Sequence, residues 1–256
     1  MNKRPLILVT NDDGITAKGI RALVEVASEF GEVVVVAPDS PQSGKGHAIT
    51  LHSPLWLHQS KIFDGIEAYE CSGTPVDCVK LAKHEVLKGR KPDLCVSGIN
   101  HGSNASLNIL YSGTMSAAME ASLEGIDSIG FSLLDFSYDA NFEPAKKFVR
   151  HLIKEVLANG LQNTKLINVN IPNLPEDEIK GIKVCKQANG QWIEDFKTNT
   201  DPFGRKYYWM TGIFINHDQS KDADILALSK GYVSVVPSAH DLTDYPALET
   251  LKGLEM

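Results

Sequence analysis

The sequence predicts an α/β protein built on a mostly parallel sheet. Leu6 to Val9 and Val33 to Val36 are unbroken apolar runs, as in strands that are buried on both faces. Between them, apolar residues recur at helical spacing from Lys18 to Phe30. A strand, a helix and a strand within about 30 residues form a βαβ unit with a right-handed crossover. The same alternation continues to Ile171.

The later elements follow in order from their own patterns. A strand is expected where apolar and polar residues alternate at Ile49–Leu57, and buried strands are expected at short apolar runs. Helices are expected where apolar residues have helical spacing or where small residues follow a polar loop. These further strands are Asp93–Ser97, Ser128–Ser132 and Leu166–Ile171, and these helices are Pro75–Leu87, Gly113–Leu123 and Phe142–Leu157.

The pattern changes after about Ile182. Lys183 to Phe196 and Arg205 to Ile215 resemble longer antiparallel strands, joined by the turn sequence Asp201-Pro202-Phe203-Gly204. A short helix at Ile225–Ser229 and a strand at Gly231–Val236 follow. We expect one domain over residues 1–256, with a core at about 1–182 and a C-terminal extension at about 183–256. A hairpin arm in such an extension is suited to contact another subunit.

Composition narrows the classes of function. The chain has 256 residues, with 32 acidic and 25 basic side chains and a net charge of −7, which argues against a nucleic-acid-binding surface. Its four cysteines include no CxxC pair and predict reduced, buried thiols. No apolar run reaches the roughly 18 residues of a membrane span, and the first one is too short for a signal peptide. We expect a cytoplasmic protein without a membrane partner.

Two adjacent carboxylates follow the first predicted strand, in the segment Thr10-Asn11-Asp12-Asp13-Gly14-Ile15. This is the end of a parallel strand at which open α/β sheets bind their ligands. Like charges this close oppose joint ionisation, and hard divalent cations take oxygen ligands. We therefore interpret Asp12 and Asp13 as ligands of a divalent metal ion. The alternative is a solvated Asp-Gly turn that caps the next helix.

Two further polar loops are expected at the same edge of the sheet. The loop from Asp39 to His47 offers Ser43 as a ligand and Gly44 as an amide donor, unless it is a plain surface loop. In the loop from Ser97 to Asn104, Asn100 can give a carbonyl oxygen to a metal or serve only as a turn residue.

A fourth loop leads directly into the predicted helix at Gly113. Exposed amides and the helix dipole make such a start an anion site, which Ser112, Gly113 and Thr114 would line. A plain N-cap is the alternative. Together the four loops place two carboxylates, a serine, an asparagine and a pair of hydroxyls at one sheet edge. That combination indicates a metal-assisted phosphoester site.

Three other residues of these loops admit two interpretations. Lys45 follows Gly44, but the loop lacks the first glycine and the Ser or Thr of a Walker motif. A solvated lysine is favoured over a phosphate-binding cation. His47 and His101 flank the site and are either structural or donors of a proton to the leaving oxygen.

Several blocks of the sequence resemble the survival protein E (SurE) family. The opening block and the GIN-G block are highly specific, and the resemblance spans nearly the whole chain. The blocks are ILVTNDDGITAKGI (Ile7 to Ile20), VVAPDSPQSGKGHAIT (Val35 to Thr50), CSGTPVDCVKLA (Cys71 to Ala82), PDLCVSGINHGSN (Pro92 to Asn104), YSGTMSAAMEA (Tyr111 to Ala121), INVNIP (Ile167 to Pro172), DPFGRKYYW (Asp201 to Trp209) and GYVSVVP (Gly231 to Pro237).

The resemblance implies a Rossmann-like three-layer α/β sandwich and a metal-dependent 5'-nucleotidase. Family members hydrolyse nucleoside monophosphates, and some act on 3'-monophosphates or polyphosphate. One Mg²⁺ or Mn²⁺ would be bound by residues that match the family's ligands, namely Asp12, Asp13, Ser43 and Asn100. Asn11 and the Ser112-Gly113-Thr114 segment would face the substrate phosphate. Assembly as a homodimer or homotetramer, partly through the C-terminal arm, is also implied.

The expected reaction is the in-line attack of a metal-activated water on phosphorus. Asp13 would orient or deprotonate this water, and the donors at the helix start would meet the charge on the phosphoryl oxygens. Two rivals remain. An aspartyl-phosphate phosphatase would use Asp12 or Asp13 as a covalent nucleophile, although adjacent aspartates fit its usual Asp-x-Asp pattern poorly. A nucleotide-sensing module would bind the same anion without turnover.

Overall fold

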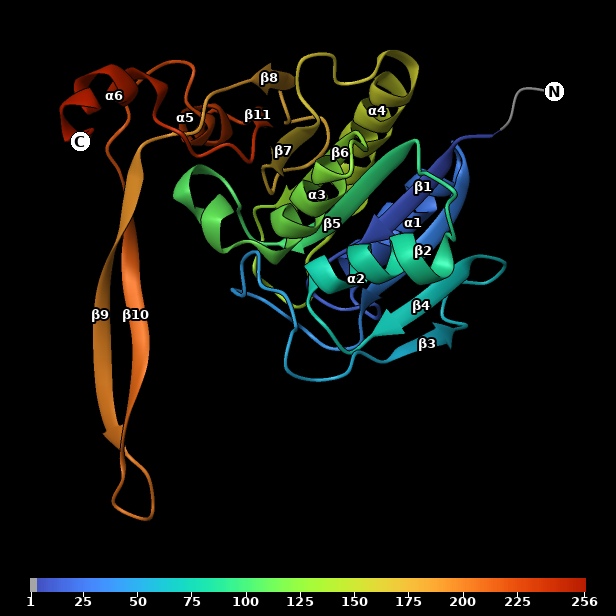
Figure 1. Cartoon of the computed structure of the whole chain (residues 1–256), viewed down its shortest axis with the longest axis horizontal. Helices are drawn as coiled ribbons and strands as arrows, with labels where there is room; N and C mark the ends of the chain where they lie inside the picture. The colour runs from blue at the N-terminus through green and yellow to red at the C-terminus, as the bar shows by residue number, and fades with distance from the viewer. Residues whose placement is uncertain (1–3) are drawn as a thin grey trace.

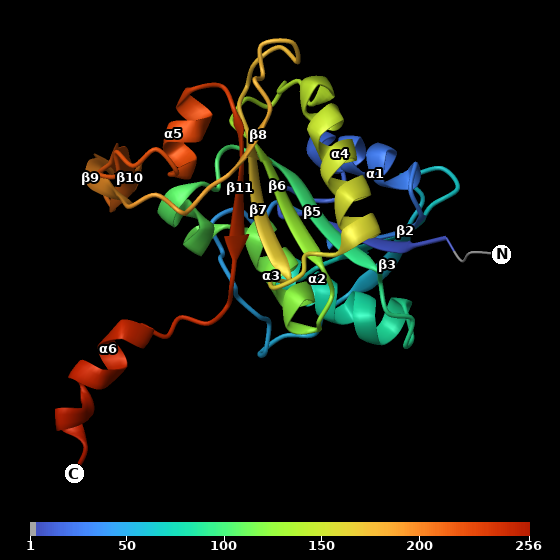
Figure 2. The ribbon, with the colours of Figure 1, turned by 90° about the horizontal axis from the view of Figure 1, so that it is seen from above.

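A nine-stranded sheet forms the body of the molecule, and helices cover both of its faces (Figures 1 and 2). This computed structural model describes residues 4–256. All neighbouring strands are parallel except for two pairs, β3 with β4 and β7 with β11. In spatial order the strands are β3 (Leu57–Ser60), β4 (Glu67–Cys71), β2 (Glu32–Pro38), β1 (Leu6–Thr10), β5 (Leu94–His101), β6 (Ser128–Leu133), β7 (Leu166–Ile171), β11 (Val233–Ser238) and β8 (Ile182–Val184).

The two faces of the sheet carry separate hydrophobic layers. Successive residues of a strand point to opposite faces, so Ile7 and Val9 pack in one layer, whereas Leu6 and Leu8 pack in the other. The first layer is covered by α1 (Lys18–Ser28) and α4 (Glu143–Asn159), and the second by α2 (Pro75–Leu81), the π-helix η1 (Ala82–Val86) and α3 (Gly113–Leu123). Figure 2 shows these helices on either side of the sheet. The predicted three-layer α/β sandwich is confirmed.

The hairpin forms a second sheet that extends away from the body (Figure 1). Its strands pair antiparallel over their whole length. The remaining elements are β9 (Gly190–Thr200), β10 (Lys206–Asn216), η2 (Ser106–Tyr111), α5 (Asp224–Ser229), α6 (Tyr245–Thr250) and η3 (Lys252–Leu254). None of the helices in residues 4–256 has the length and hydrophobicity needed to cross a membrane. The four cysteines are buried and unpaired, as expected.

The predicted strand at Ile49–Leu57 is wrong. The edge strand β3 begins only at Leu57, and the preceding segment is an irregular loop in which Ile49 and Leu51 are exposed. Thr50 explains the path of this loop, because its backbone amide and its hydroxyl donate to Asp77 at 3.1 and 2.6 Å. The loop is therefore bound to the start of α2 and not to a neighbouring strand.

Two other predicted strands differ most from the observed ones. The expected strand at Lys183–Phe196 is split, because β8 pairs with β11 in the main sheet before the chain leaves to form β9. The strand expected at Asp93–Ser97 begins at Leu94 and continues to His101. A register shift between Ser97 and Asn100 interrupts its pairing with β6. Such irregularities re-aim side chains near functional sites.

The order of the strands places a ligand crevice beside β1. From β1 the chain moves outward to β2 on one side, and from β5 it moves outward through β6 and β7 on the other. Ligands bind at this kind of reversal, outside the carboxyl ends of the strands. The ends of β1, β2 and β5 are the positions from which the polar loops of the sequence emerge.

Candidate active site

Asp12 lies at the end of β1, against the first turn of α3. The residue is only 4% exposed, and the Thr114 hydroxyl donates a hydrogen bond to its Oδ1. A Cβ at Gly113 would lie 2.6 Å from the Asp12 Cβ. The helix can begin this close to the carboxylate because Gly113 has no side chain. The sequence thus brings a helix N-terminus onto the first aspartate.

Burial beside a second acid perturbs Asp12. Loss of solvation and then the charge of Asp13 raise the pKa of Asp12 from 3.8 to about 6, although the hydrogen bonds from Thr114 oppose this change. Burial also raises the pKa of Asp13, against a backbone hydrogen bond from His101. A cation bound between the two carboxylates would remove the cause of their mutual repulsion. The site therefore favours positive charge.

The end of β5 joins the site through Asp13. The backbone amide of His101 donates to Asp13 Oδ2 at 3.1 Å. The neighbouring Asn100 uses its amide nitrogen within its own turn, donating to the carbonyl oxygens of His101 and Gly102 at 3.2 and 2.9 Å. Its side-chain carbonyl oxygen is then the group left to offer a ligand.

Two backbone hydrogen bonds hold the loop after β2 beside Asp12 and the start of α3. The Gln42 amide donates to the backbone carbonyl of Asp12 at 2.7 Å, and the Gly46 amide donates to that of Tyr111 at 3.2 Å. Between these anchors, Ser43 and Gly44 are exposed. The structure thus brings the Ser43 loop beside Asp12. Lys45 is solvated, as favoured from the sequence.

Ser112 and Thr114 have different local roles. The Ser112 hydroxyl oxygen accepts from the Met115 amide at 3.0 Å, so Ser112 is the N-cap of α3. Its hydroxyl proton is not used in that bond. The single hydroxyl proton of Thr114 is directed to Asp12. Asn11 donates from Nδ2 to the Gly14 carbonyl at 2.9 Å and is buried.

Unpartnered polar atoms gather at this edge. Thr10 Oγ1, Asn11 Oδ1 and Ser97 Oγ are buried and, within residues 4–256, have no hydrogen-bond partner. Thr10, at the end of β1, is the register partner of Ser97, within β5. Most buried polar atoms in native proteins are satisfied, so three such atoms close to Asp12 add to the case for a candidate site here; Ser234 Oγ on β11 is a fourth atom of this kind. Thr10 and Ser97 were not predicted, because a hydroxyl inside an apolar strand gives no periodic signal.

Sequence reasoning also missed Glu120. This residue of α3 is 4% exposed, and it accepts hydrogen bonds from His47 Nε2 at 3.0 Å and from Lys80 Nζ. His47 therefore has a partner, which connects the Ser43 loop to α3. His101 is bound differently, donating from Nδ1 to the Ser137 carbonyl at 3.0 Å. The available signal for Glu120 was its charge, because most other residues of the α3 sequence are small or apolar.

The donor set suits a hard divalent cation. Residues 4–256 contain no group of three or more His, Cys, Asp or Glu side chains arranged for a metal. Mg²⁺, however, is commonly bound by one or two carboxylates and keeps other positions for water and substrate phosphate. Two repelling carboxylates, a free amide carbonyl and a serine hydroxyl fit that pattern. The chemistry of the residues present is therefore compatible with the ion.

Comparisons with known proteins show the family to which the chain is similar. The family model for survival protein SurE matches residues 7–194. A 5'-nucleotidase SurE from Christiangramia forsetii is 61% identical over 98% of this chain and 97% of that protein. One from Bacteroides fragilis is 46% identical over 100% and 99%. The crystal structure of a SurE protein from Aquifex aeolicus is 41% identical, with a TM-score of 0.85, and covers 98% of this chain and 100% of that one.

Proposed function

The chain belongs to the survival protein SurE family and is a 5'-nucleotidase, and we propose that it hydrolyses nucleoside 5'-monophosphates at the Asp12–Asp13 pair with one divalent metal ion. The observation that carries this proposal is the contact between Asp12 and the first turn of α3. This contact places the carboxylates, which favour a cation, next to the N-terminus of α3, which favours an anion. A metal-bound phosphate ester needs both.

Asp12, Asp13, Ser43 and Asn100 would hold the ion, which we expect to be Mg²⁺ or Mn²⁺. When bound, the ion supplies Lewis-acid polarisation of the phosphoryl group and lowers the pKa of a coordinated water. The two carboxylates provide the charge that such an ion requires, and Ser43 and Asn100 add neutral oxygens. Thr114 positions Asp12 by its hydrogen bond.

The start of α3 would bind the substrate phosphate. The first amides of a helix have no intrahelical acceptor, and the helix dipole adds positive potential there. The Gly113 amide and the free hydroxyl proton of Ser112 are suited to donate to phosphoryl oxygens, as is the exposed amide of Gly44. The buried side-chain carbonyl of Asn11 is held in place because Nδ2 of the same side chain donates to the Gly14 carbonyl. Asn11 thereby shapes the site beside the phosphate.

Asp13 is the residue suited to orient the attacking water. One of its oxygens accepts the His101 amide, which fixes the plane of the carboxylate. The residue is only partly buried, so solvent reaches it. A carboxylate in this position can accept a proton from water as the water attacks phosphorus in line with the ribose oxygen. As its bond to phosphorus breaks, the ribose oxygen takes up a proton from solvent and leaves as a hydroxyl.

Release of phosphate tests the proposal. Purified protein should release inorganic phosphate from adenosine 5'-monophosphate with added Mg²⁺ or Mn²⁺, and should lose this activity in excess chelator. Full activity in chelator would reject the metal-dependent mechanism. Mass spectrometry of protein quenched during turnover tests the rival covalent route, because a trapped phospho-aspartate at Asp12 or Asp13 would favour that route over direct attack by water.

We further propose that the protein is a homodimer or homotetramer in which a second copy of the chain covers the hairpin. Large apolar side chains such as Phe196, Trp209, Met210 and Ile213 are exposed on it. An isolated two-stranded ribbon is at best marginally stable in water, and symmetric self-association is the usual way for a chain to cover such a surface. Sedimentation of the full chain as a monomer at micromolar concentration would contradict this.

A further inference from the structure

A cavity opens directly beside Asp13. Its lining residues come from the segment between β1 and the start of α1, the loop after β2, the end of β5 and the loop after β6, and they are Asp13, Thr16, Ala17, Lys18, Pro41, His101, Phe136 and Tyr138. The residues Phe136 and Tyr138 are 81% and 86% exposed. Two aromatic side chains are thus held in water next to a proposed metal ligand. Nothing in the proposed hydrolysis uses them.

The loop that carries these rings is held in place. His101 donates to the Ser137 carbonyl at 3.0 Å. The Asp135 carboxylate accepts from the Ser137 amide at 2.8 Å and from Asn173 Nδ2 at 3.0 Å. The Leu134 amide donates to the Ile171 carbonyl at 2.9 Å. The exposed aromatic residues therefore lie on a preorganised segment between the ends of β5 and β7.

One side of each ring is already engaged. The Phe136 ring lies close over Gly102, where an added Cβ would come within 2.1 Å of Cε1. Lys18 Nζ lies 5.3 Å from the centroid of the Tyr138 ring, and it also pairs with Asp139 at 2.7 Å. Each ring is thus supported from one side while most of its surface stays accessible. An aromatic ring supported in this way is a platform for a planar ligand.

We propose that Phe136 and Tyr138 form the nucleobase subsite, with the base stacked on Phe136 and Tyr138 as a second wall. This rests on the proposed 5'-nucleotidase function. The phosphate and the base lie at opposite ends of a nucleotide, so a base site should adjoin the metal site without overlapping it. The cavity meets this requirement through Asp13. Aromatic stacking accepts every base, because each one has a π-face.

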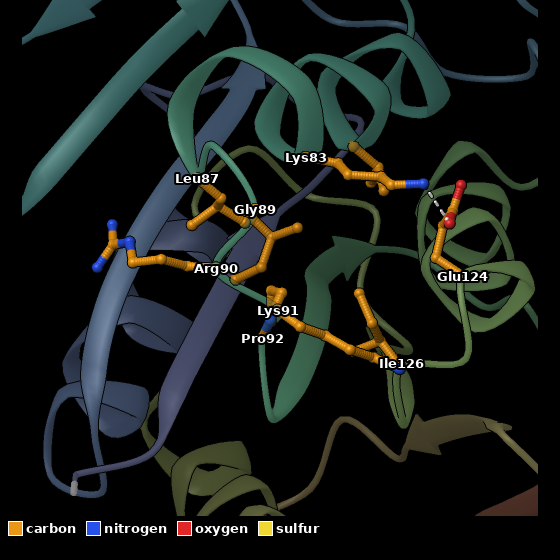
Figure 3. Close-up of a pocket in the computed structure, with 10 residues that line it drawn as sticks. Lys83, Leu87, Gly89, Arg90, Lys91, Pro92, Glu124 and Ile126 are labelled. Carbon is orange, nitrogen blue, oxygen red and sulfur yellow. Dashed lines mark hydrogen bonds and ion pairs between the residues drawn. The ribbon is translucent and has the colours of Figure 1, made fainter.

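Two other cavities are less suited to this role. One is lined by His47, Met119 and the segment from Val236 to Leu242, and it contains none of the proposed metal or phosphate ligands. The other, shown in Figure 3, lies at the start of β5 and the end of α3. It has the Lys83–Glu124 ion pair at its rim and a mostly apolar lining. That position is at the opposite edge of the sheet from Asp13.

Comparison of a nucleotide with a substrate that lacks the base tests the proposal. For Phe136→Ala we expect kcat/KM to fall about tenfold on adenosine 5'-monophosphate and to stay unchanged on ribose 5-phosphate. Phe136→Trp should retain the wild-type preference. Trp56→Ala, at an exposed aromatic residue just before β3, is the control and should change neither value. In chelator, saturation-transfer NMR should show weaker contact between adenine protons and Phe136→Ala than wild type.

The outcomes separate this proposal from the function on which it rests. An equal loss on both substrates in Phe136→Ala, or a wild type that does not prefer the nucleotide, would overturn the base subsite and leave the phosphatase function intact. A wild type that releases phosphate from neither substrate with Mg²⁺ or Mn²⁺ would overturn the proposed function itself.

Discussion

The carboxyl edge of the sheet and the C-terminal hairpin differ in how strongly they are buried and in how many other segments they contact. At the sheet edge, Asp12 and Asn11 are buried and the loops are hydrogen-bonded to one another. In the hairpin, the two strands bond to each other and most side chains face solvent. Figure 1 shows one region inside the body and the other projecting from it.

This difference shows which interactions hold each region in its conformation. The sheet edge is fixed by neighbours within the chain, including contacts that join residues about a hundred positions apart, such as Thr114 with Asp12. The hairpin has few such neighbours, and a contact from Trp192 Nε1 to Asn108 Oδ1 at 2.8 Å lies near its base. Changes at the sheet edge should therefore alter chemistry, whereas changes in the hairpin should alter association.

The largest effect is expected at Asp12. Asp12→Asn removes one charge from the ion site while keeping the shape of the side chain, so kcat/KM should fall about 10³-fold, in line with several kcal/mol of lost charge stabilisation. Phosphate release measures this, and circular dichroism reports folding. Asp195→Asn, at an exposed position of β9, is the matched control. A similar loss of activity in both variants would contradict the expectation that only changes at the sheet edge alter the chemistry.

The stability of metal-free protein should depend on pH through Asp12. Its pKa is about 6 when folded and is ordinarily 3.8, so between these values the folded state keeps a proton that the unfolded chain has released. The stabilisation is complete below pH 3.8 and is lost as the pH rises through 6, by about 3 kcal/mol. Burial of Asp13 acts in the same direction.

Urea unfolding in chelator between pH 4 and pH 7 measures this dependence. Asp12→Asn should remove the Asp12 part and give a flatter profile, whereas Asp195→Asn should follow the wild type. Wild-type and Asp12→Asn profiles that run parallel would show that the perturbed carboxylate lies elsewhere.

A smaller effect is expected at Glu120. Glu120→Ala removes the acceptor that binds His47 and so loosens the loop that carries Ser43. Loss of a group that orients a metal ligand typically lowers metal affinity by about 10- to 100-fold, and we expect the lower figure. Titration with Mn²⁺ measures it. Glu124→Ala, at a more exposed residue one turn later that pairs with Lys83, should leave the affinity unchanged.

The smallest effect on the folded protomer is expected in the hairpin. Met210→Asp places a charge on an exposed apolar position, so the free energy of unfolding of the protomer should change by no more than about 0.5 kcal/mol. The assembly should instead dissociate, which analytical ultracentrifugation would detect as slower sedimentation. Unchanged sedimentation together with lost activity would show that the hairpin serves the active site directly.

Much of the fold was predictable because its signals are local. Fully apolar runs marked β1 and β2, and helical spacing marked α1, each within one or two residues of the observed ends. The edge of the sheet was harder. The strand β4 was not predicted, and the alternation at Ile49–Leu57 reflects a loop bound to Asp77. A hydrogen bond between distant residues leaves no periodic trace in the sequence.

The candidate site shows the same limit. The carboxylates, Ser43 and Asn100 could be named because loops at the ends of parallel strands share one edge. Glu120, which holds the Ser43 loop through His47, and Phe136 of the proposed base subsite could not be named, since no pattern in the sequence assigns either residue to the site. Their involvement depends on packing between segments, which only the folded arrangement provides.

The hairpin leaves and re-enters the fold at adjacent places. The strands before and after it, β8 and β11, are neighbours in the main sheet, so residues 190–216 form a detour whose ends are both anchored. Its length can thus be changed without reordering any strand. Eleven residues per strand carry the Asp201–Gly204 turn about 35 Å outward at ~3.3 Å per residue. A peptide grafted into the turn would lie far from the candidate site of its own chain, and a shortened hairpin would leave the strand order of the main sheet unchanged.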